Sequence, residues 1–337
     1  MDFTLKLQLA YQKILQAKKI LLIGHLSPDA DALASIGAMI EVIKETKAEI
    51  YAYTANKQVG VYDFIANEEL VSSVEPSDLR NFDLILIFDC GSIARTGLET
   101  RIRNLITAAG QGMIKSRPYI IEFDHHEPQE AYADLEIRDP HKASTTEIVY
   151  HFLKANGLVI TKEMANCILI GLMTDTGHFL HANSSQEALA IAAEMLMRGA
   201  ALPKIINKTV RNQSFSSLKV WGRALKNMKY NSETGFVFSA LTEEELAELL
   251  TPEELLSPGD LFGGIVSFLS CLSGVRVALF LREENGQVKG SLRTNLDDVD
   301  VAQLAGQWGG GGHKKAAGFS LKGKLQATET GWKVVRT

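Results

Sequence analysis

The chain has 337 residues, of which 46% are hydrophobic and 22% charged, and this composition excludes disordered and fibrous proteins. Its formal net charge of −5 argues against a protein that coats long duplex nucleic acid. Three cysteines, outside any CxxC spacing, imply neither a disulfide framework nor a thiolate zinc site. No apolar run approaches the roughly 18 residues that span a bilayer, so we expect a cytoplasmic protein with no membrane partner.

Short apolar runs alternate with helical patterns over about the first 190 residues. We predict strands within 19–25, 49–54, 83–90 and 119–126, and helices within 31–47 and 144–157. Strands that are apolar throughout, rather than alternating, indicate a parallel sheet covered on both faces. The predicted fold class is therefore α/β, with a doubly wound, mainly parallel sheet in a first domain, residues 1–190.

Residues 191–233 are predicted to form a helical basic linker. Between residues 198 and 229 the chain has eight basic side chains and no acidic one: Arg198, Lys204, Lys208, Arg211, Lys219, Arg223, Lys226 and Lys229. Such a segment is either a solvated helix face or an attractor for a short polyanion. In the second case Phe215 or Trp221 would be available to stack on nucleobases.

Residues 234–337 are predicted to form a second, smaller α/β domain. The stretch 275–294 indicates two strands joined by a turn at Asn285 and Gly286. The acidic stretch 242–256 is most simply one solvated helix.

Polar residues follow three of the predicted strands, where ligands bind in open parallel sheets. A further acid ends an apolar helical run. Taken singly, Asp29 or Asp31 could cap the helix that follows, and Asp175 could cap a turn. Taken together, four carboxylates at one edge would resist joint ionisation and require positive charge. The four are Asp29, Asp31, Asp89 and Asp175, and the same motifs also contain His25, Asp124, His125 and His126.

Divalent cations are the expected source of that charge, because Arg95 is the only basic residue within these motifs. Carboxylate and imidazole ligands without thiolate fit Mn²⁺ or Mg²⁺, and the histidines favour Mn²⁺. Six ligands suit two ions that share one carboxylate. Such a pair would hold a water as hydroxide and clamp the oxygens of a phosphoryl displacement.

A glycine run, Gly309 to Gly312, precedes His313, Lys314 and Lys315. Its backbone N–H groups could form an anion-binding nest at what is predicted to be a helix start, or the run could be a flexible link. Nearby Arg293 is either a bidentate phosphate partner or an exposed strand arginine.

These motifs resemble, in this order along the chain, those of the DHH/DHHA1 phosphoesterases. They are H-x3-D-x-D (25–31), D (89), DHH (124–126), TDTG (174–177) and GGGH (310–313). The resemblance spans nearly the whole chain and is strongest with the nanoRNase/pAp phosphatase branch. Together the five motifs are highly specific, although each one alone is weak.

The resemblance implies a role for each position. One Mn²⁺ would be held by His25, Asp29 and Asp89, and the other by Asp31, Asp89, His125 and Asp175. Asp124 would orient its neighbours, and His126 would contact the scissile phosphate or protonate the leaving oxygen. Substrate would be bound by Arg95, by Arg293 with Ser291, and by Gly310, Gly311, Gly312 and His313.

The function implied is a Mn²⁺-dependent phosphoesterase, with Mg²⁺ or Co²⁺ as substitutes, that hydrolyses very short RNA oligonucleotides to mononucleotides or removes the 3′-phosphate of pAp. Alternatives are a cyclic-di-AMP or pApA phosphodiesterase and an exopolyphosphatase, with an inorganic pyrophosphatase ranked lower. A different class is a nucleotide sensor that binds without turnover. Some relatives self-associate, so the resemblance leaves a homodimer open.

Overall fold

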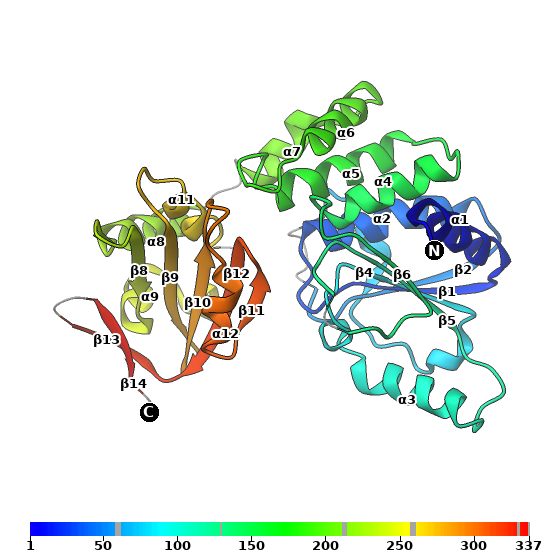
Figure 1. Cartoon of the computed structure of the whole chain (residues 1–337), viewed down its shortest axis with the longest axis horizontal. Helices are drawn as coiled ribbons and strands as arrows, with labels where there is room; N and C mark the ends of the chain where they lie inside the picture. Colours follow the sequence, from blue (N-terminus) through cyan, green and yellow to red (C-terminus); the bar gives the residue numbers. More distant parts are fainter. Residues whose placement is uncertain (58–61, 129, 211–213, 257–260, 329–330, 336–337) are drawn as a thin grey trace. The chain divides into compact units, whose positions relative to one another are not determined.

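The computed structural model describes residues 1–337 except 58–61, 129, 211–213, 257–260, 329–330 and 336–337. The chain divides into two compact units, Met1–Arg211 and Asn212–Thr337 (Figure 1). Each unit has its own sheet and its own hydrophobic core.

The first unit contains a six-stranded sheet in the order β3-β2-β1-β4-β5-β6. All of its strand pairs are parallel, which confirms the predicted fold class. Its edge strands β3 and β6 were not predicted, because they are short and β6 alternates between buried and half-buried residues. The strands are β1 Lys19–Ile23, β2 Glu49–Tyr53, β3 Val71–Ser72, β4 Leu84–Phe88, β5 Tyr119–Asp124 and β6 Leu135–Arg138.

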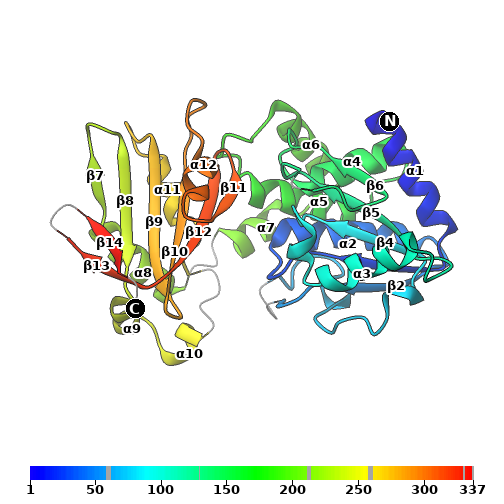
Figure 2. The same cartoon turned by 60° about the horizontal axis from the view of Figure 1, so that its bottom comes forward.

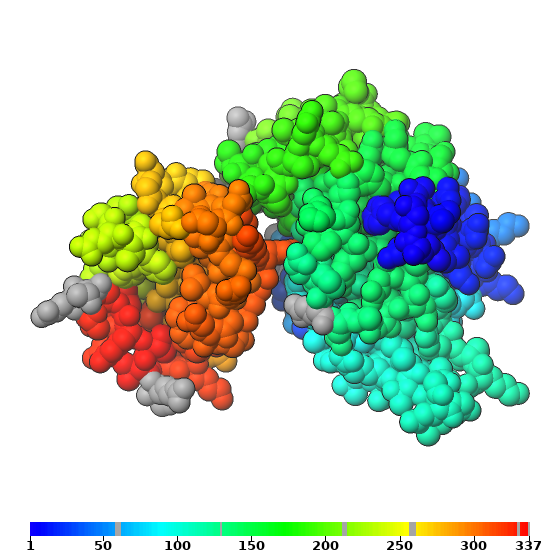
Figure 3. Space-filling view, viewed as in Figure 1, coloured from blue at the N-terminus to red at the C-terminus, as the bar shows by residue number. Residues whose placement is uncertain are grey.

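Helices cover both faces of this sheet. Successive strand residues enter different cores: Ile20 and Leu22 pack in the larger one, whereas Leu21 and Ile23 pack in the smaller one beside α3. Figure 1 shows α4, α5 and α6 on one side of this sheet and α3 on the other, and the space-filling view shows these sides in green and in cyan (Figure 3). The helices are α1 Phe3–Gln16, α2 Ala30–Lys44, α3 Glu99–Gly110, α4 Thr145–Ala155, α5 Lys162–Asp175, α6 Gln186–Met197 and α7 Leu202–Thr209.

The strand order reverses direction between β1 and β4. From β1 the chain proceeds to β2 and β3 on one side, and then returns to β4, β5 and β6 on the other. The connections that leave β1 and β4 therefore diverge at the carboxyl ends of these strands, the place where ligands bind in open α/β sheets. The polar residues that follow β1, β4 and β5 lie at this edge.

The second unit contains a mixed sheet in the order β11-β12-β10-β9-β8-β7, seen side by side in Figure 2. Only β8 and β9 pair in parallel. The predicted turn is confirmed, because Asn285 and Gly286 both have positive φ between β9 and β10. The strands are β7 Lys229–Asn231, β8 Phe236–Leu241, β9 Val277–Glu284, β10 Gln287–Arg293, β11 Gly311–His313 and β12 Ala316–Lys322, with β13 Lys324–Ala327 and β14 Trp332–Val335 as a separate pair.

The helices of the second unit are α8 Phe215–Lys226, α9 Glu243–Leu249, α10 Pro252–Leu256, α11 Ile265–Ser270 and α12 Val301–Gly306. The acidic stretch predicted as one helix is two, because Leu250 is extended and Pro252 begins the second helix. Among the described residues, no helix of either unit combines the length and apolar character needed to cross a bilayer.

The segment predicted as a basic linker is shared between the units. Helices α6 and α7 belong to the first unit, whereas α8 and β7 belong to the second. The domain limits 190 and 233 remain predictions, since compactness places the division at residues 211 and 212.

Candidate functional site

The carboxyl edge of the first sheet gathers most of the residues singled out in the sequence. His25 follows β1, Asp89 follows β4, and His125 and His126 follow β5. The remaining members come from helix ends: Asp29 is the N-cap of α2, Asp31 lies in its first turn, and Asp175 is the last residue of α5.

The first group at this edge consists of His25, Asp29 and Asp89. The His25 Nε2 atom lies 3.6 Å from Asp29 Oδ2 and 3.7 Å from Asp89 Oδ2. Because a carbonyl oxygen only accepts, His25 Nδ1 donates to the Leu26 carbonyl at 2.8 Å, and in the neutral form of the ring Nε2 would carry the lone pair. Among the described residues, this buried Nε2 has no hydrogen-bond partner. A buried lone pair between two carboxylates fits a cation.

The second group contains Asp31, Asp89 and His125, whose ligand atoms lie within 4.8 Å of one another. His125 Nε2 is 3.5 Å from Asp89 Oδ1 and 3.2 Å from Asp175 Oδ2. Its Nδ1 faces the Lys142 carbonyl at 3.2 Å, as His25 Nδ1 faces a carbonyl. The two oxygens of Asp89 thus face two different histidines, so this carboxylate could bridge two ions.

The conformation of Asp89 makes this arrangement available. Its φ is 59°, in the left-handed region that non-glycine residues rarely adopt, and its N–H donates to the Phe123 carbonyl at 3.0 Å. Strained backbone of this kind persists only where its surroundings enforce it, and it is concentrated at functional sites. The bend turns the carboxylate toward both histidine groups immediately after the buried strand β4.

The N-terminus of α4 holds Asp31 in place. The backbone N–H groups of Thr145 and Thr146 donate to its two oxygens at 2.6 Å and 3.1 Å, and the Thr145 hydroxyl donates to Asp89 Oδ1 at 2.9 Å. A helix N-terminus favours a carboxylate through its unpaired N–H groups and its dipole. Sequence reasoning missed this support, although the Ser-Thr-Thr-Glu run, residues 144–147, marks a helix start.

Gly171 in α5 is a second contribution that the sequence did not reveal. A Cβ at this position would lie 2.2 Å from both Asp31 Oδ1 and Thr146 Oγ1. Only glycine lets α5 pass so close to the carboxylate and its helix-end donors. A lone glycine in an apolar helix gave no signal of this role.

Burial and crowding shift the ionisation of these carboxyl groups. Burial and the charges of Asp31 and Asp29 raise the pKa of Asp89 well above its usual range. Burial also raises the pKa of Asp31, against the opposing charge of His125. The Asp29 side chain is half exposed, and its interaction with the adjacent His25 ring lowers its pKa despite the opposing cost of desolvation. Bound cations would offset the repulsion between these carboxylates and would lower their pKa values.

Asp124 supports His126, and its ligand atom lies within 4.8 Å of those of Asp89 and His126. Its Oδ1 accepts from the His126 N–H at 2.8 Å and lies 2.8 Å from the ring Nδ1. Its Oδ2 accepts from the Gly91 N–H. Burial opposes its ionisation, but the hydrogen bond and charge of His126 lower the pKa of Asp124 to about 2. Asp124 therefore fixes the His126 ring, whose Nδ1 is also 3.5 Å from Asp89 Oδ1.

Arg95, on the short 3-10 helix Ile93–Thr96, lies beside His126. A Cβ at Gly91 would be 3.5 Å from the Arg95 Nη1 and 3.4 Å from the His126 ring. Among the residues that the structure describes, no carboxylate lies within salt-bridge distance of the Arg95 guanidinium. This cation is therefore available to an anionic ligand at the site.

In the second unit, the glycine run does not begin a helix, contrary to the sequence prediction. Helix α12 ends at Gly306, and Gly311–His313 forms the edge strand β11. A Cβ at Gly310 would lie 2.1 Å from the Gly318 carbonyl oxygen, whereas at Gly311 it would meet open space. Close packing against β12 explains why position 310 requires glycine. Gly311, in contrast, is exposed.

The sheet register brings Arg293 and His313 into one row. Both pair with Ala316 of β12, Arg293 from β10 and His313 from β11. Residues directly opposite in antiparallel strands share a face, so the two side chains flank a small alanine. Trp308, which the sequence reading passed over, precedes the glycine run and packs against Phe319, with ring centroids 4.6 Å apart and ring planes tilted by 40°.

The basic segment is partly neutralised. Ion pairs join Arg198 to Glu194, Lys208 to Asp63, and Arg223 to Glu245. Arg211 lies outside the described residues.

The two aromatic residues proposed for stacking differ. Phe215 is 86% exposed, but Trp221 packs against the core of the second unit and against Phe268. Trp221 is only partly buried, and stacking on Phe215 or Trp221 stays a prediction.

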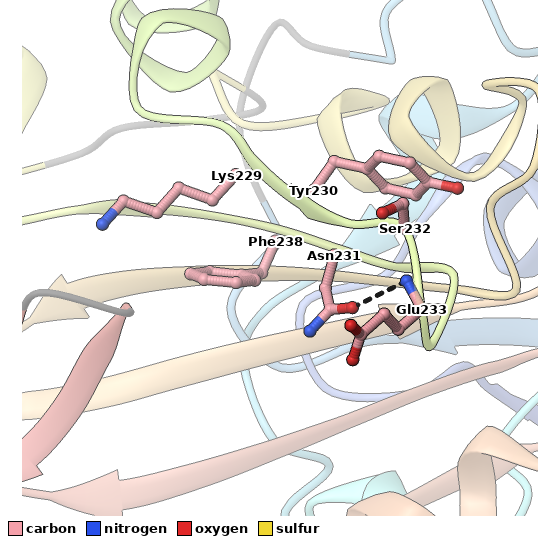
Figure 4. Close-up of a pocket in the computed structure, with 6 residues that line it drawn as sticks. All are labelled: Lys229, Tyr230, Asn231, Ser232, Glu233 and Phe238. Carbon is pink, nitrogen blue, oxygen red and sulfur yellow. Dashed lines mark hydrogen bonds between the residues drawn. The ribbon is translucent and has the colours of Figure 1, made fainter.

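A shallow depression in the second unit lies along the exposed edge strand β7 (Figure 4). There Asn231 Oδ1 accepts from the Glu233 N–H at 3.0 Å. The residues that line this depression include one carboxylate and no histidine. They therefore offer no cluster of metal-ligating side chains like the one at the sheet edge of the first unit. The lining residues are Lys229, Tyr230, Asn231, Ser232, Glu233 and Phe238.

Comparisons with known proteins identify both units. Residues 19–172 match the model of the DHH family, N-terminal domain, and residues 256–331 match that of the DHHA1 domain. The chain is 32% identical over 205 residues to the bifunctional oligoribonuclease and PAP phosphatase NrnA of Thermus thermophilus, covering 61% of the chain but only 59% of that protein. It is 25% identical over 305 residues to the protein of the same name from Bacillus subtilis, covering 90% of the chain and 89% of the relative.

A solved structure shares the fold of both units. The crystal structure of an exopolyphosphatase-related protein from Bacteroides fragilis matches with a TM-score of 0.80 at 25% identity. The match covers 94% of this chain and 90% of that protein.

Proposed function

Because the chain belongs to the DHH family of phosphoesterases and carries the DHHA1 domain, we propose that it hydrolyses very short RNA oligonucleotides to mononucleotides and removes the 3′-phosphate of pAp. The names of the two relatives support this substrate class. The observation that carries the proposal is the position of Asp89, whose two oxygens face His25 on one side and His125 on the other.

The donor set fits two divalent ions, of which Mn²⁺ suits the mixture of imidazole and carboxylate best. His25, Asp29 and Asp89 would hold one ion. Asp31, Asp89, His125 and Asp175 would hold the other. When bound, the ions supply Lewis-acid charge and lower the pKa of water, as two-metal phosphoesterase sites do.

The remaining residues of the edge would act on the substrate. Arg95 would bind a phosphate oxygen, since no carboxylate of the described residues engages it. His126, with its ring fixed by Asp124, would contact the scissile phosphate or pass a proton to the leaving oxygen.

In the second unit, Arg293 and His313 would bind a further phosphate of the nucleotide. Their common partner Ala316 leaves the space between them unfilled by a large side chain. The exposed backbone of Gly311, with Gly310 and Gly312 on either side, would add N–H donors.

A substrate panel tests the proposal. The full chain is assayed with Mn²⁺ on pAp, di- to pentaribonucleotides, linear and cyclic di-AMP, and polyphosphate. We expect turnover of pAp and of the shortest ribonucleotides, lost on chelation and in Asp89→Asn but kept in the surface control Asp78→Asn. Nucleotide binding without turnover of any substrate would contradict the proposal and indicate a sensor.

Polyphosphate is a specific second candidate, because the structural relative is described as exopolyphosphatase-related. Preferential turnover of polyphosphate, or of cyclic di-AMP, would support the proposed active site but would show that its substrate is a different one.

A further inference from the structure

Arg138 ends β6, the edge strand that the sequence did not predict. It pairs in register with Asp124 at the end of β5, and its side chain is only 6% exposed. Side chains two apart on a strand share a face, so Glu122 and Asp124 lie on the same side of the sheet as Arg138. The Arg138 Nη2 atom is 2.7 Å from Glu122 Oε1 and 3.5 Å from Asp124 Oδ2.

The same guanidinium contacts backbone on both sides of the site. Arg138 Nη1 donates to the His126 carbonyl at 3.0 Å and to the Glu127 carbonyl at 3.3 Å, both in the segment after β5. It also reaches the Gly91 carbonyl at 3.5 Å, in the loop after β4. Asp124 joins the same two segments with its acceptors, through the His126 and Gly91 N–H groups. Arg138 and Asp124 therefore brace the two loops together.

We propose that Arg138 is a positioning residue that holds Asp124 and the His126 backbone so that the His126 ring faces Asp89. Arg138 lies on the side of Asp124 away from the ring: Oδ1 of Asp124 engages His126, whereas Oδ2 faces Arg138 and Gly91. Its effect on catalysis would pass through that carboxylate. The kinetic part of this inference rests on the proposed function, whereas the orientation of His126 does not.

A competing explanation is that Arg138 only neutralises Glu122. Glu122 is fully buried, and its Oε1 accepts from the Tyr132 hydroxyl as well as from Arg138. If charge balance were the whole role, removing both charges together would be harmless. If Arg138 positions His126, removing both charges would still remove the hydrogen bonds from Arg138 to the His126 and Gly91 carbonyls.

Three variants separate these explanations. Glu122→Gln removes the partner charge and keeps the guanidinium on Asp124, His126 and Gly91. Arg138→Lys keeps one positive charge but loses the fork that reaches both loops. The double variant Glu122→Gln with Arg138→Met removes both charges. Arg103→Lys, at an exposed ion pair on α3, is the matched control for arginine replacement.

The first measurement is the ¹⁵N–¹H spectrum of the histidine side chains, with the His126 signal assigned by its loss in His126→Asn. We expect the hydrogen-bonded Nδ1–H signal of His126 to persist in Glu122→Gln and Arg103→Lys. It should shift or broaden in Arg138→Lys and in the double variant. This readout needs neither metal nor turnover, so it decides the inference even if the wild type is inactive on every substrate.

The second measurement is steady-state kinetics with Mn²⁺. We expect kcat to fall about tenfold to a hundredfold in Arg138→Lys and in the double variant, the range typical of residues that orient a site from behind. KM and Mn²⁺ affinity should stay within about twofold, because the described contacts of Arg138 include none of the proposed metal ligands. Wild-type kcat and an unchanged His126 signal in the double variant would overturn the inference. Should that variant not fold, Arg138→Lys indistinguishable from Arg103→Lys would overturn it equally.

Discussion

The two candidate regions hold their polar groups in opposite ways. At the sheet edge of the first unit, His25, Asp31 and Asp89 are only 3%, 1% and 2% exposed, and neighbouring backbone or side chains fix them. In the second unit, Gly311 lies on an exposed edge strand with open space where a side chain would be. The first region suits chemistry that needs fixed charges, and the second suits contacts with a ligand that approaches from solvent.

The largest effect should come from Asp89, the residue common to both groups of the buried region. Asp89→Asn keeps the shape of the side chain but removes the charge that two ions would share. We expect kcat/KM to fall by more than about a hundredfold, beyond the loss typical of outer contacts. Mn²⁺ binding, measured by calorimetry, should weaken at the same time. Unchanged Mn²⁺ binding in a folded variant would refute the shared-ligand role.

Gly171 tests whether the buried region depends on close packing. Gly171→Ala would place a methyl group against Asp31 and Thr146, at 2.2 Å in the present geometry, so one of them must move. We expect activity to fall about tenfold to a hundredfold through the displaced Asp31. Gly222→Ala in α8, where a Cβ meets nothing within 4 Å, is the control and should be neutral or stabilising. Equal activities of the two variants would contradict the packing role.

The buried region should also make stability depend on pH. Burial and the Asp124 charge raise the pKa of Glu122 to about 7 from its usual 4.5, against the opposing Arg138 charge. The folded chain then holds this proton more tightly than the unfolded chain does. The resulting stabilisation is present below pH 4.5 and is lost as the pH rises to about 7.

Glu122→Gln should abolish that dependence. The difference in free energy of unfolding between wild type and variant should change by at most about 3 kcal/mol over this interval, in favour of the variant at higher pH. Urea unfolding in metal-free buffer from pH 4.5 to 8 measures the difference. A difference that stays constant with pH would argue against a shifted Glu122.

The smallest effects are expected in the exposed region of the second unit. Gly310→Ala would force a Cβ to 2.1 Å from the Gly318 carbonyl oxygen, whereas Gly311→Ala adds a methyl group in open space. We expect Gly310→Ala to destabilise the second unit by about 1–3 kcal/mol, as overpacking does. Gly311→Ala should leave stability unchanged and raise KM without lowering kcat. If KM were unchanged in both variants, β11 would not be part of the substrate-binding site.

Local patterns in the sequence were sufficient for the framework of the site. Continuous apolar runs marked β1, β4 and β5, and the acids and histidines directly after them were expected at one edge because parallel strands end together. The Asn285–Gly286 turn was equally local, since two residues with positive φ determine it. In each case the deciding interaction lies within a few residues of the signal.

Tertiary structure alone decided how those groups are held. Thr145 donates to Asp31 across 114 residues and to Asp89 across 56, and no local pattern connects such positions. Helix packing likewise determined the need for glycine at position 171, and the pairing of β6 with β5 determined the burial of Arg138. The glycine run became a strand rather than a helix start because β12 was there to pair with it. Backbone preferences act between neighbours in the chain, whereas these contacts exist only once distant segments have packed together.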